Sequence, residues 1–169
     1  MLASKQVLVG GGSQIPTPTA EPALDTETAA RLRTAIGKLS RRLRTTAAGR
    51  AAGLTPTGSS VLLNIDRHGP IRLSELAASE GINPTMLSRV VADLVEGGLL
   101  ERSSDSGDRR AAWVKATRAG RQTAHRMRRE RTNALNEAMT ALTADERYTI
   151  EVALEALESL AEELKERRP

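Results

Sequence analysis

The chain contains no cysteine and no phenylalanine, and it has one tryptophan, Trp113, and one tyrosine, Tyr148. The absence of cysteine excludes disulfides, thiolate nucleophiles, cysteine-ligated zinc and thiol redox sensing, and the expected setting is a reducing cytoplasm. With so few aromatic residues, the core has to be built from leucine, valine, isoleucine, alanine and methionine. Such a core favours the packing of helices over a β-sandwich, whose strands are rich in β-branched and aromatic residues.

Long hydrophobic runs and catalytic motifs are missing as well. No apolar run reaches the roughly 18 to 20 residues of a membrane span, and the N-terminus lacks the hydrophobic segment of a signal peptide. Neither phosphate-binding glycine motif occurs, and His68 and His125 have no second ligand at metal-binding spacing. We therefore expect no enzyme, no metal, no cofactor and no membrane partner.

Charge of both signs is present but unevenly placed. The net charge is +4 and the isoelectric point is about 10.1, which favours a polyanionic partner. Residues 31–50 and 118–131 are strongly basic, whereas residues 151–166 are acidic. The positive field is therefore expected to lie away from the C-terminal helix.

A helix-turn-helix is indicated after residue 73. Ala77 is the small residue expected where two helices cross, and Gly81 falls at the turn, where a positive φ favours glycine. Asn83 as N-cap and Pro84 in the first position predict a second helix that ends at Glu96. The positions expected to face inward are Leu76, Ile82, Leu87 and Val90.

The N-terminal turns of this second helix carry the residue types that read base edges. The candidates for contact with DNA are Asn83, Thr85, Met86, Ser88 and Arg89. Arg89 can hydrogen-bond guanine O6 and N7 in a bidentate fashion. Thr85 and Ser88 could instead contact phosphate or only be solvated, and Met86 could instead pack inward.

Two short strands around a polar turn at Ser106, Gly107 and Asp108 are predicted to follow, which would form a β-hairpin wing. Ile71 and Arg72 are expected to add a very short strand against it. A helix-turn-helix with a basic wing indicates duplex DNA as the partner.

These residues together resemble the MarR family of winged-helix transcription regulators. The likeness is carried by residues 75–102, by an Asp-x-Arg element at Asp108-Arg109-Arg110, and by Thr117 and Gly120 at the start of the next helix. The resemblance implies that the wing contacts DNA. An Asp two residues before an Arg can hold the guanidinium in a fixed direction. We therefore expect Arg110 to enter the minor groove and Arg109 to meet phosphate or solvent; the alternative is a wing in which Asp108 only makes the turn.

The resemblance also implies a small ligand, often an aromatic or phenolic anion, bound between the dimerisation helices and the winged domain. Release of DNA on ligand binding would follow. The residues that the resemblance suggests as neighbours of such a ligand are Arg33, Leu62, His68 and Trp113.

The remaining helices are predicted from capping residues. A first helix from Asp25 is expected to close at residues 49–53, and a second to run from Thr55 to about His68. Ser74 is expected to cap the first helix of the helix-turn-helix. Thr117 is expected to cap a helix to about Leu142, and Thr143 with Glu146 to form a capping box for the last helix.

Narrow apolar seams on the outer helices call for a partner. The seam positions are Leu32, Ile36, Leu39 and Leu43 in the first helix and Ile150, Leu154, Leu157, Ala161 and Leu164 in the last. One small winged-helix core cannot cover these seams, whereas an intertwined homodimer can, and twofold symmetry suits a palindromic DNA site.

The expected fold is mostly α with a small β-hairpin wing, in the α+β class: a winged helix-turn-helix with N- and C-terminal helices in an intertwined dimerisation bundle. The expected regions are a disordered tail (1–23), a dimerisation helix (24–50), the DNA-binding domain (51–116) and C-terminal dimerisation helices (117–169). The expected function is a homodimeric, sequence-specific transcriptional regulator that binds a pseudo-palindromic operator, a repressor released by a small molecule. The alternative is an architectural or protein-interaction module without operator specificity.

Overall fold

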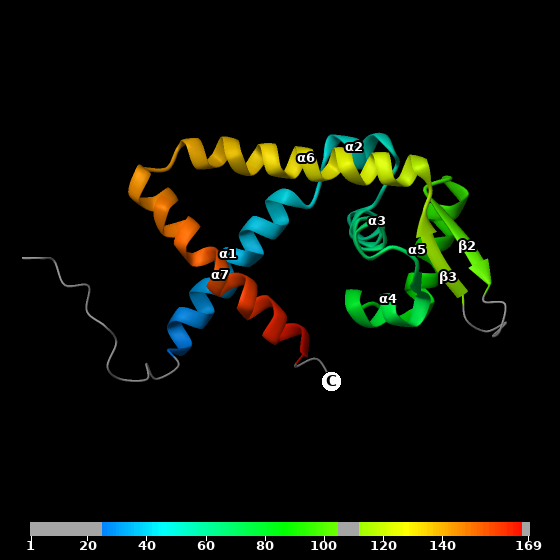
Figure 1. The fold of residues 1–169 in the computed structure, drawn as a ribbon, viewed down its shortest axis with the longest axis horizontal. Coiled ribbons are helices and arrows are strands. Elements are labelled where there is room, and N and C mark those ends of the chain that lie inside the picture. The colour runs from blue at the N-terminus through cyan, green and yellow to red at the C-terminus, as the bar shows by residue number, and fades with distance from the viewer. Residues whose placement is uncertain (1–24, 105–111, 167–169) are drawn as a thin grey trace, which may run out of the picture. The chain divides into compact units, whose positions relative to one another are not determined.

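The computed structural model describes residues 25–104 and 112–166. Residues 1–38 and 39–169 fall into two units, so the first part of the N-terminal helix is described apart from the rest. None of the helices within the described residues is long and apolar enough to cross a membrane. In chain order the elements are α1 (Thr26–Leu43), α2 (Ala47–Ala51), α3 (Pro56–His68), β1 (Ile71–Arg72), α4 (Leu73–Glu80), α5 (Pro84–Glu96), β2 (Leu100–Ser104), β3 (Ala112–Ala116), α6 (Arg118–Thr140) and α7 (Ala144–Glu166). Figure 1 labels all of them except β1.

The first helix, α1, begins at a cap formed by Asp25. Its carboxylate accepts hydrogen bonds from the Thr28 hydroxyl at 2.8 Å and from the Glu27 amide at 2.9 Å. These two bonds, the Thr28 side chain first, lower the pKa of Asp25 because they favour the ionised form. Along the predicted seam, Ile36 is 47% exposed and Leu39 is 54% exposed. The seam therefore presents uncovered apolar surface within one chain.

The prediction that the first helix continues to residues 49–53 was wrong. The helix ends at Leu43, and α2 follows as a separate short helix. Thr46 has an extended backbone, with φ −117° and ψ 156°, and its hydroxyl accepts a hydrogen bond from the Gly49 amide. A threonine hydroxyl competes well for such amides outside a helix, so Thr46 starts a new helix instead of continuing the old one.

The core of the winged domain is aliphatic, as the composition predicts. Its large, fully buried side chains are Val61, Leu62, Ile65, Leu76, Leu87, Val91, Leu100 and Val114. Burial of each such side chain contributes about 1.5–3 kcal/mol. Ile82 and Val90 pack against this cluster while partly exposed.

Helix α3 forms the centre of this core and has the predicted ends. The Thr55 hydroxyl accepts a hydrogen bond from the Gly58 amide at 3.0 Å, Pro56 occupies the first turn, and Gly69 follows the last residue. Its buried face carries Val61 and Ile65, so α3 supports the helix-turn-helix from behind, as expected.

A three-stranded antiparallel sheet in the order β1-β3-β2 completes the winged domain. The short strand predicted at Ile71 and Arg72 is confirmed, with Arg72 opposite Trp113. Ser74, however, does not cap α4: the helix begins at Leu73, and Arg72 occupies the cap position without a side-chain cap bond. Pairing of Arg72 in the sheet sends the chain directly from strand into helix and leaves no turn for a serine cap.

The junction between the sheet and α6 is closely packed. Thr117 caps α6 as predicted, since its hydroxyl accepts a hydrogen bond from the Gly120 amide at 3.0 Å. The same hydroxyl donates to the Gly98 carbonyl at 2.7 Å. A Cβ on Gly120 would lie 2.0 Å from the Leu99 carbonyl oxygen, so only glycine fits. Thr117 and Gly120 thus fix where α6 leaves the sheet.

The capping box predicted for the last helix is confirmed. The Glu146 carboxylate accepts from the Thr143 amide at 2.8 Å, and the Glu146 amide donates to the Thr143 hydroxyl at 3.2 Å. Helix α7 then leaves much of its apolar surface uncovered: Ile150 is 39% exposed, Leu154 48% and Leu157 39%.

Candidate nucleic-acid interface

The helix-turn-helix consists of α4 and α5, joined at Gly81. Gly81 has a left-handed backbone, with φ 64° and ψ 32°, as expected for the turn. The Asn83 side chain accepts a hydrogen bond from the Thr85 amide at 2.8 Å and so caps α5 at the predicted residue. Leu87 and Leu94 bury the opposite face of α5 in the core. The Asn83 cap and the two buried leucines together hold α5 so that its first turns face solvent.

All the side chains proposed to read bases are solvent-exposed. They are Asn83, Thr85, Met86, Ser88 and Arg89. Met86 is 59% exposed, so it does not take the inward alternative. The face therefore combines an amide, hydroxyls, a thioether and a guanidinium, which can donate and accept hydrogen bonds at base edges.

The described part of the wing is a regular antiparallel pair. Glu101 lies opposite Lys115, and their charged groups form an ion pair at 3.3 Å. The Arg72 guanidinium lies over the Trp113 ring, 5.1 Å from its centroid, a cation–π contact that joins the edge strand to the wing. The residues expected to contact DNA from the wing tip, Asp108, Arg109 and Arg110, lie outside the described residues.

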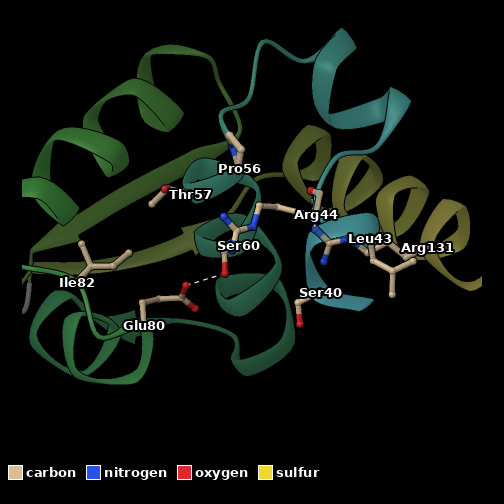
Figure 2. Close-up of a pocket in the computed structure, with 9 residues that line it drawn as sticks. All are labelled: Ser40, Leu43, Arg44, Pro56, Thr57, Ser60, Glu80, Ile82 and Arg131. Atoms are coloured by element: carbon tan, nitrogen blue, oxygen red, sulfur yellow. Dashed lines mark hydrogen bonds between the residues drawn. The ribbon is translucent and has the colours of Figure 1, made fainter. Parts of the chain in front are cut away.

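A cleft adjoins the helix-turn-helix on the side of α3 and α6. One cavity of about 510 Å³ is lined by Ser40, Leu43, Arg44, Pro56, Thr57, Ser60, Glu80, Ile82 and Arg131, and Figure 2 draws these side chains. A second cavity of about 450 Å³ shares Ser60, Glu80 and Arg131 with it. The size is in the range of small-molecule pockets, about 300–1,000 Å³.

Arg131 is the most unusual side chain of this cleft. Burial lowers its pKa, although a guanidinium stays charged at any physiological pH. One of its terminal nitrogens donates to the Arg44 carbonyl at 3.3 Å, whereas its buried Nε has no hydrogen-bond partner. Within the described residues, no carboxylate pairs with the guanidinium of Arg131 or Arg44. The cleft therefore offers two cationic groups to an occupant.

The residues suggested as ligand neighbours are dispersed. Leu62 is 0% exposed in the core, so we do not retain it as a ligand contact. His68 lines the second cavity, and its Nδ1 lies 3.0 Å from the Asn64 side-chain oxygen. Trp113 belongs to the sheet and Arg33 to an exposed face of α1; neither lines these two cavities.

Sequence reasoning missed Glu80, Ser60, Arg44 and Arg131, which line the cleft. The signal available was weak: a serine and an acidic residue on different helices have no fixed spacing. No cluster of three or more potential metal ligands occurs in the part of the chain that the structure describes.

Comparison with known proteins gives a consistent result. Residues 54–112 match the model of the MarR family. The HTH-type regulator YwhA of Bacillus subtilis, itself uncharacterized, is 28% identical over 89 residues, which are 53% of this chain and 64% of that protein. The match therefore spans just under two thirds of that relative's length.

Solved structures share the fold over most of the chain. The apo form of wild-type MarR from E. coli is 25% identical with a TM-score of 0.65, over 76% of this chain and 95% of that one. NadR in complex with 4-hydroxyphenylacetate is 19% identical with a TM-score of 0.64, over 90% of this chain and 100% of that one. With the winged helix-turn-helix and the family match in agreement, the chain belongs to the MarR family, whose members are DNA-binding transcription regulators and not enzymes.

Proposed function

We propose that the protein is a homodimeric repressor that binds a pseudo-palindromic operator, acts in the cytoplasm and releases DNA when a small ligand binds. The single observation that carries the DNA-binding part is the exposed polar start of α5, capped by Asn83 and held outward by buried Leu87 and Leu94. In a twofold dimer, two such helices would enter successive major grooves about 34–36 Å apart.

Arg89 is the residue proposed to carry most of the base reading. Arg89→Ala should cost about 1–3 kcal/mol of operator binding and relax preference at one position in each half-site. Arg129→Ala, which removes an exposed arginine of α6, is the matched control and should change specificity little. Binding to sites selected from genomic DNA, measured by fluorescence anisotropy at fixed salt, tests this. Uniform weakening on all sequences would place Arg89 on a phosphate instead.

The same binding measurements distinguish an operator-specific regulator from an architectural module. A specific regulator should prefer its selected site over unrelated DNA by about 10³-fold or more. A preference near unity would support the architectural alternative.

The wing is proposed to contribute a second contact. Arg110 would enter the minor groove beside each major-groove contact, oriented by Asp108, with Arg109 nearer a phosphate. Arg110→Ala should weaken binding and reduce preference for A·T flanks. Asp108→Ala should weaken binding too, although it removes a negative charge; tighter binding by this variant across a salt titration would contradict an orienting role.

The proposed dimer is supported by exposed apolar side chains on α1 and α7. Ile36, Leu39, Leu154 and Leu164 are each between 47% and 59% exposed, and a second copy would cover such surfaces. Leu157→Glu should shift the protein toward monomer in analytical ultracentrifugation and weaken operator binding, whereas Glu158→Ala on the same helix should not. A Leu157→Glu variant that stays fully dimeric would contradict this use of α7.

The ligand is proposed to bind in the cleft beside α3, α4 and α6. The guanidinium groups of Arg44 and Arg131, which have no carboxylate partner among the described residues, and the apolar side chains of Leu43, Pro56 and Ile82 suit a small aromatic or phenolic anion. Arg44→Ala should abolish binding of such an anion while leaving operator binding in its absence intact. Unchanged ligand affinity in this variant would place the ligand elsewhere.

A further inference from the structure

Glu80, the last residue of α4, occupies an unusual position in the cleft. Its Oε2 accepts a hydrogen bond from the Ser60 hydroxyl at 2.7 Å, and its Oε1 accepts one from the side-chain Nδ2 of Asn64 at 2.5 Å. Both donors belong to α3, so these bonds join the end of the first helix of the helix-turn-helix to the helix behind it. An ionised carboxylate has about four acceptor sites, so Glu80 can still accept from a further donor.

The walls of the cleft carry opposite charges. Figure 2 shows Arg44 and Arg131 reaching into the cavity from the side of α1 and α6, and Glu80 from the side of α4. An occupant with only a negative group would satisfy the arginines but would place nothing against the carboxylate. An occupant with a hydrogen-bond donor at its other end would satisfy both walls, because bonds to an ionised acceptor are the stronger kind.

We propose that the ligand of this cleft carries an anionic group at one end and a hydrogen-bond donor, a hydroxyl or an ammonium, at the other, and that Glu80 is the residue that selects the donor. This inference rests on the proposed use of the cleft as a ligand site. Leu43, Pro56 and Ile82 line the middle of the cleft, so a ring or short hydrocarbon joins the two ends of the ligand.

Selection by Glu80 also links occupancy to DNA binding. A ligand donor that binds a free acceptor site of Glu80 draws the carboxylate toward the cleft, and any lengthening of its bonds to Ser60 and Asn64 weakens the attachment of α4 to α3. Gly81 and the α5 cap at Asn83 follow immediately. The donor end of the ligand therefore acts on the orientation of the helix-turn-helix, whereas the anionic end supplies affinity.

Three probes with the same acid and ring test this in the full chain: phenylacetate, 4-hydroxyphenylacetate and 4-(aminomethyl)phenylacetate. In isothermal titration calorimetry, the two donor probes should bind the wild type at least about tenfold more tightly than phenylacetate. In Glu80→Gln, the advantage of the ammonium probe should fall below about threefold, while phenylacetate binds at least as well as before. Glu75→Gln, an exposed carboxylate on the same helix, should keep the wild-type ranking.

A second measurement follows DNA release by fluorescence anisotropy at equal occupancy of each probe. The donor probes should release DNA from the wild type at least about fivefold more effectively than phenylacetate, and Glu80→Gln should remove the difference. Equal binding of all three probes by the wild type would overturn the inference without any variant. If binding of phenylacetate is then still lost in Arg44→Ala, the cleft remains the proposed ligand site although Glu80 does not select the donor. If none of the probes binds at millimolar concentration, both the proposed ligand site and the role of Glu80 are wrong.

Discussion

Gly120 is the position at which a single methyl group should have the largest effect on folding. It is buried in the first turn of α6, and a Cβ there would lie 2.0 Å from the Leu99 carbonyl oxygen and 3.4 Å from the Leu62 Cδ1. The position of the Leu99 carbonyl is itself fixed, because its oxygen accepts a hydrogen bond from the Thr117 amide at 3.0 Å. Gly120→Ala therefore cannot be accommodated by rotation of a flexible side chain, and backbone has to move.

The expected magnitude follows from three effects. Forcing a methyl group into a packed site costs about 1–3 kcal/mol. Moving the start of α6 also weakens the Thr117 cap, and loss of a cap costs about 0.5–2 kcal/mol. Alanine recovers about 0.5–1 kcal/mol through its better helix propensity. We expect a net loss of about 3 kcal/mol in the free energy of unfolding.

Urea unfolding followed by circular dichroism, at one fixed protein concentration, measures this loss. With an m value of about 2 kcal/mol/M, the midpoint should fall by about 1.5 M urea. Gly37→Ala in α1 is the matched control, since a Cβ there meets nothing within 4 Å; it should be neutral or stabilising. A Gly120→Ala protein as stable as the wild type would show that the contact with Leu99 does not constrain the junction.

Two further predictions concern helix starts. The Glu130 carboxylate accepts a hydrogen bond from the Ala48 amide at 3.1 Å. Glu130→Ala should leave the start of α2 without this acceptor and lower the free energy of unfolding in urea by about 1–2 kcal/mol, and Glu130→Gln should lower it less. An unchanged midpoint in Glu130→Ala would contradict a stabilising role for this hydrogen bond. Hydrogen bonds from the backbone and then the side chain of Thr143 lower the pKa of Glu146. Thr143→Ala should raise that pKa in an NMR titration. Because the folded pKa lies below the unfolded value, the stabilisation is present above about pH 4 and is lost as pH falls through the folded pKa. An unshifted pKa in the variant would show that the Thr143 hydroxyl does not contribute, since the backbone amide, the larger cause, remains.

Elements with local signals could be predicted from the sequence. The starts of α3, α5 and α6 each follow a side chain that caps the helix two or three residues ahead, at Thr55, Asn83 and Thr117. Such bonds depend only on neighbouring residues, so residue types at fixed spacing identify them. The exposed start of α5 could be predicted for the same reason, because the apolar positions at helical spacing define its buried face.

Elements held by distant residues could not be predicted. The break between α1 and α2 has a local cap at Thr46, but the Ala48 amide beside it is held by Glu130, 82 residues away in the sequence. Glu80 belongs to the cleft only because α4 packs its end beside Ser60 and Asn64 of α3. Neither contact has a spacing in the sequence that distinguishes it from an ordinary charged residue on a solvated helix.

One turn of α6 joins the cleft to the helices that support the winged domain. Arg128 pairs with Asp66 of α3, Glu130 accepts the Ala48 amide of α2, and Arg131 donates to the Arg44 carbonyl. The Asp66 side chain is only 6% exposed, so loss of its partner would leave a carboxylate poorly solvated and bind α6 less firmly to α3. Because Arg131 also lines the cleft, an anion bound there, as proposed above, would contact the segment that fixes α2 and α3 against α6. Glu80 lines the other side of the cleft at the end of α4, so the proposed ligand would contact both supports of the recognition helix at once.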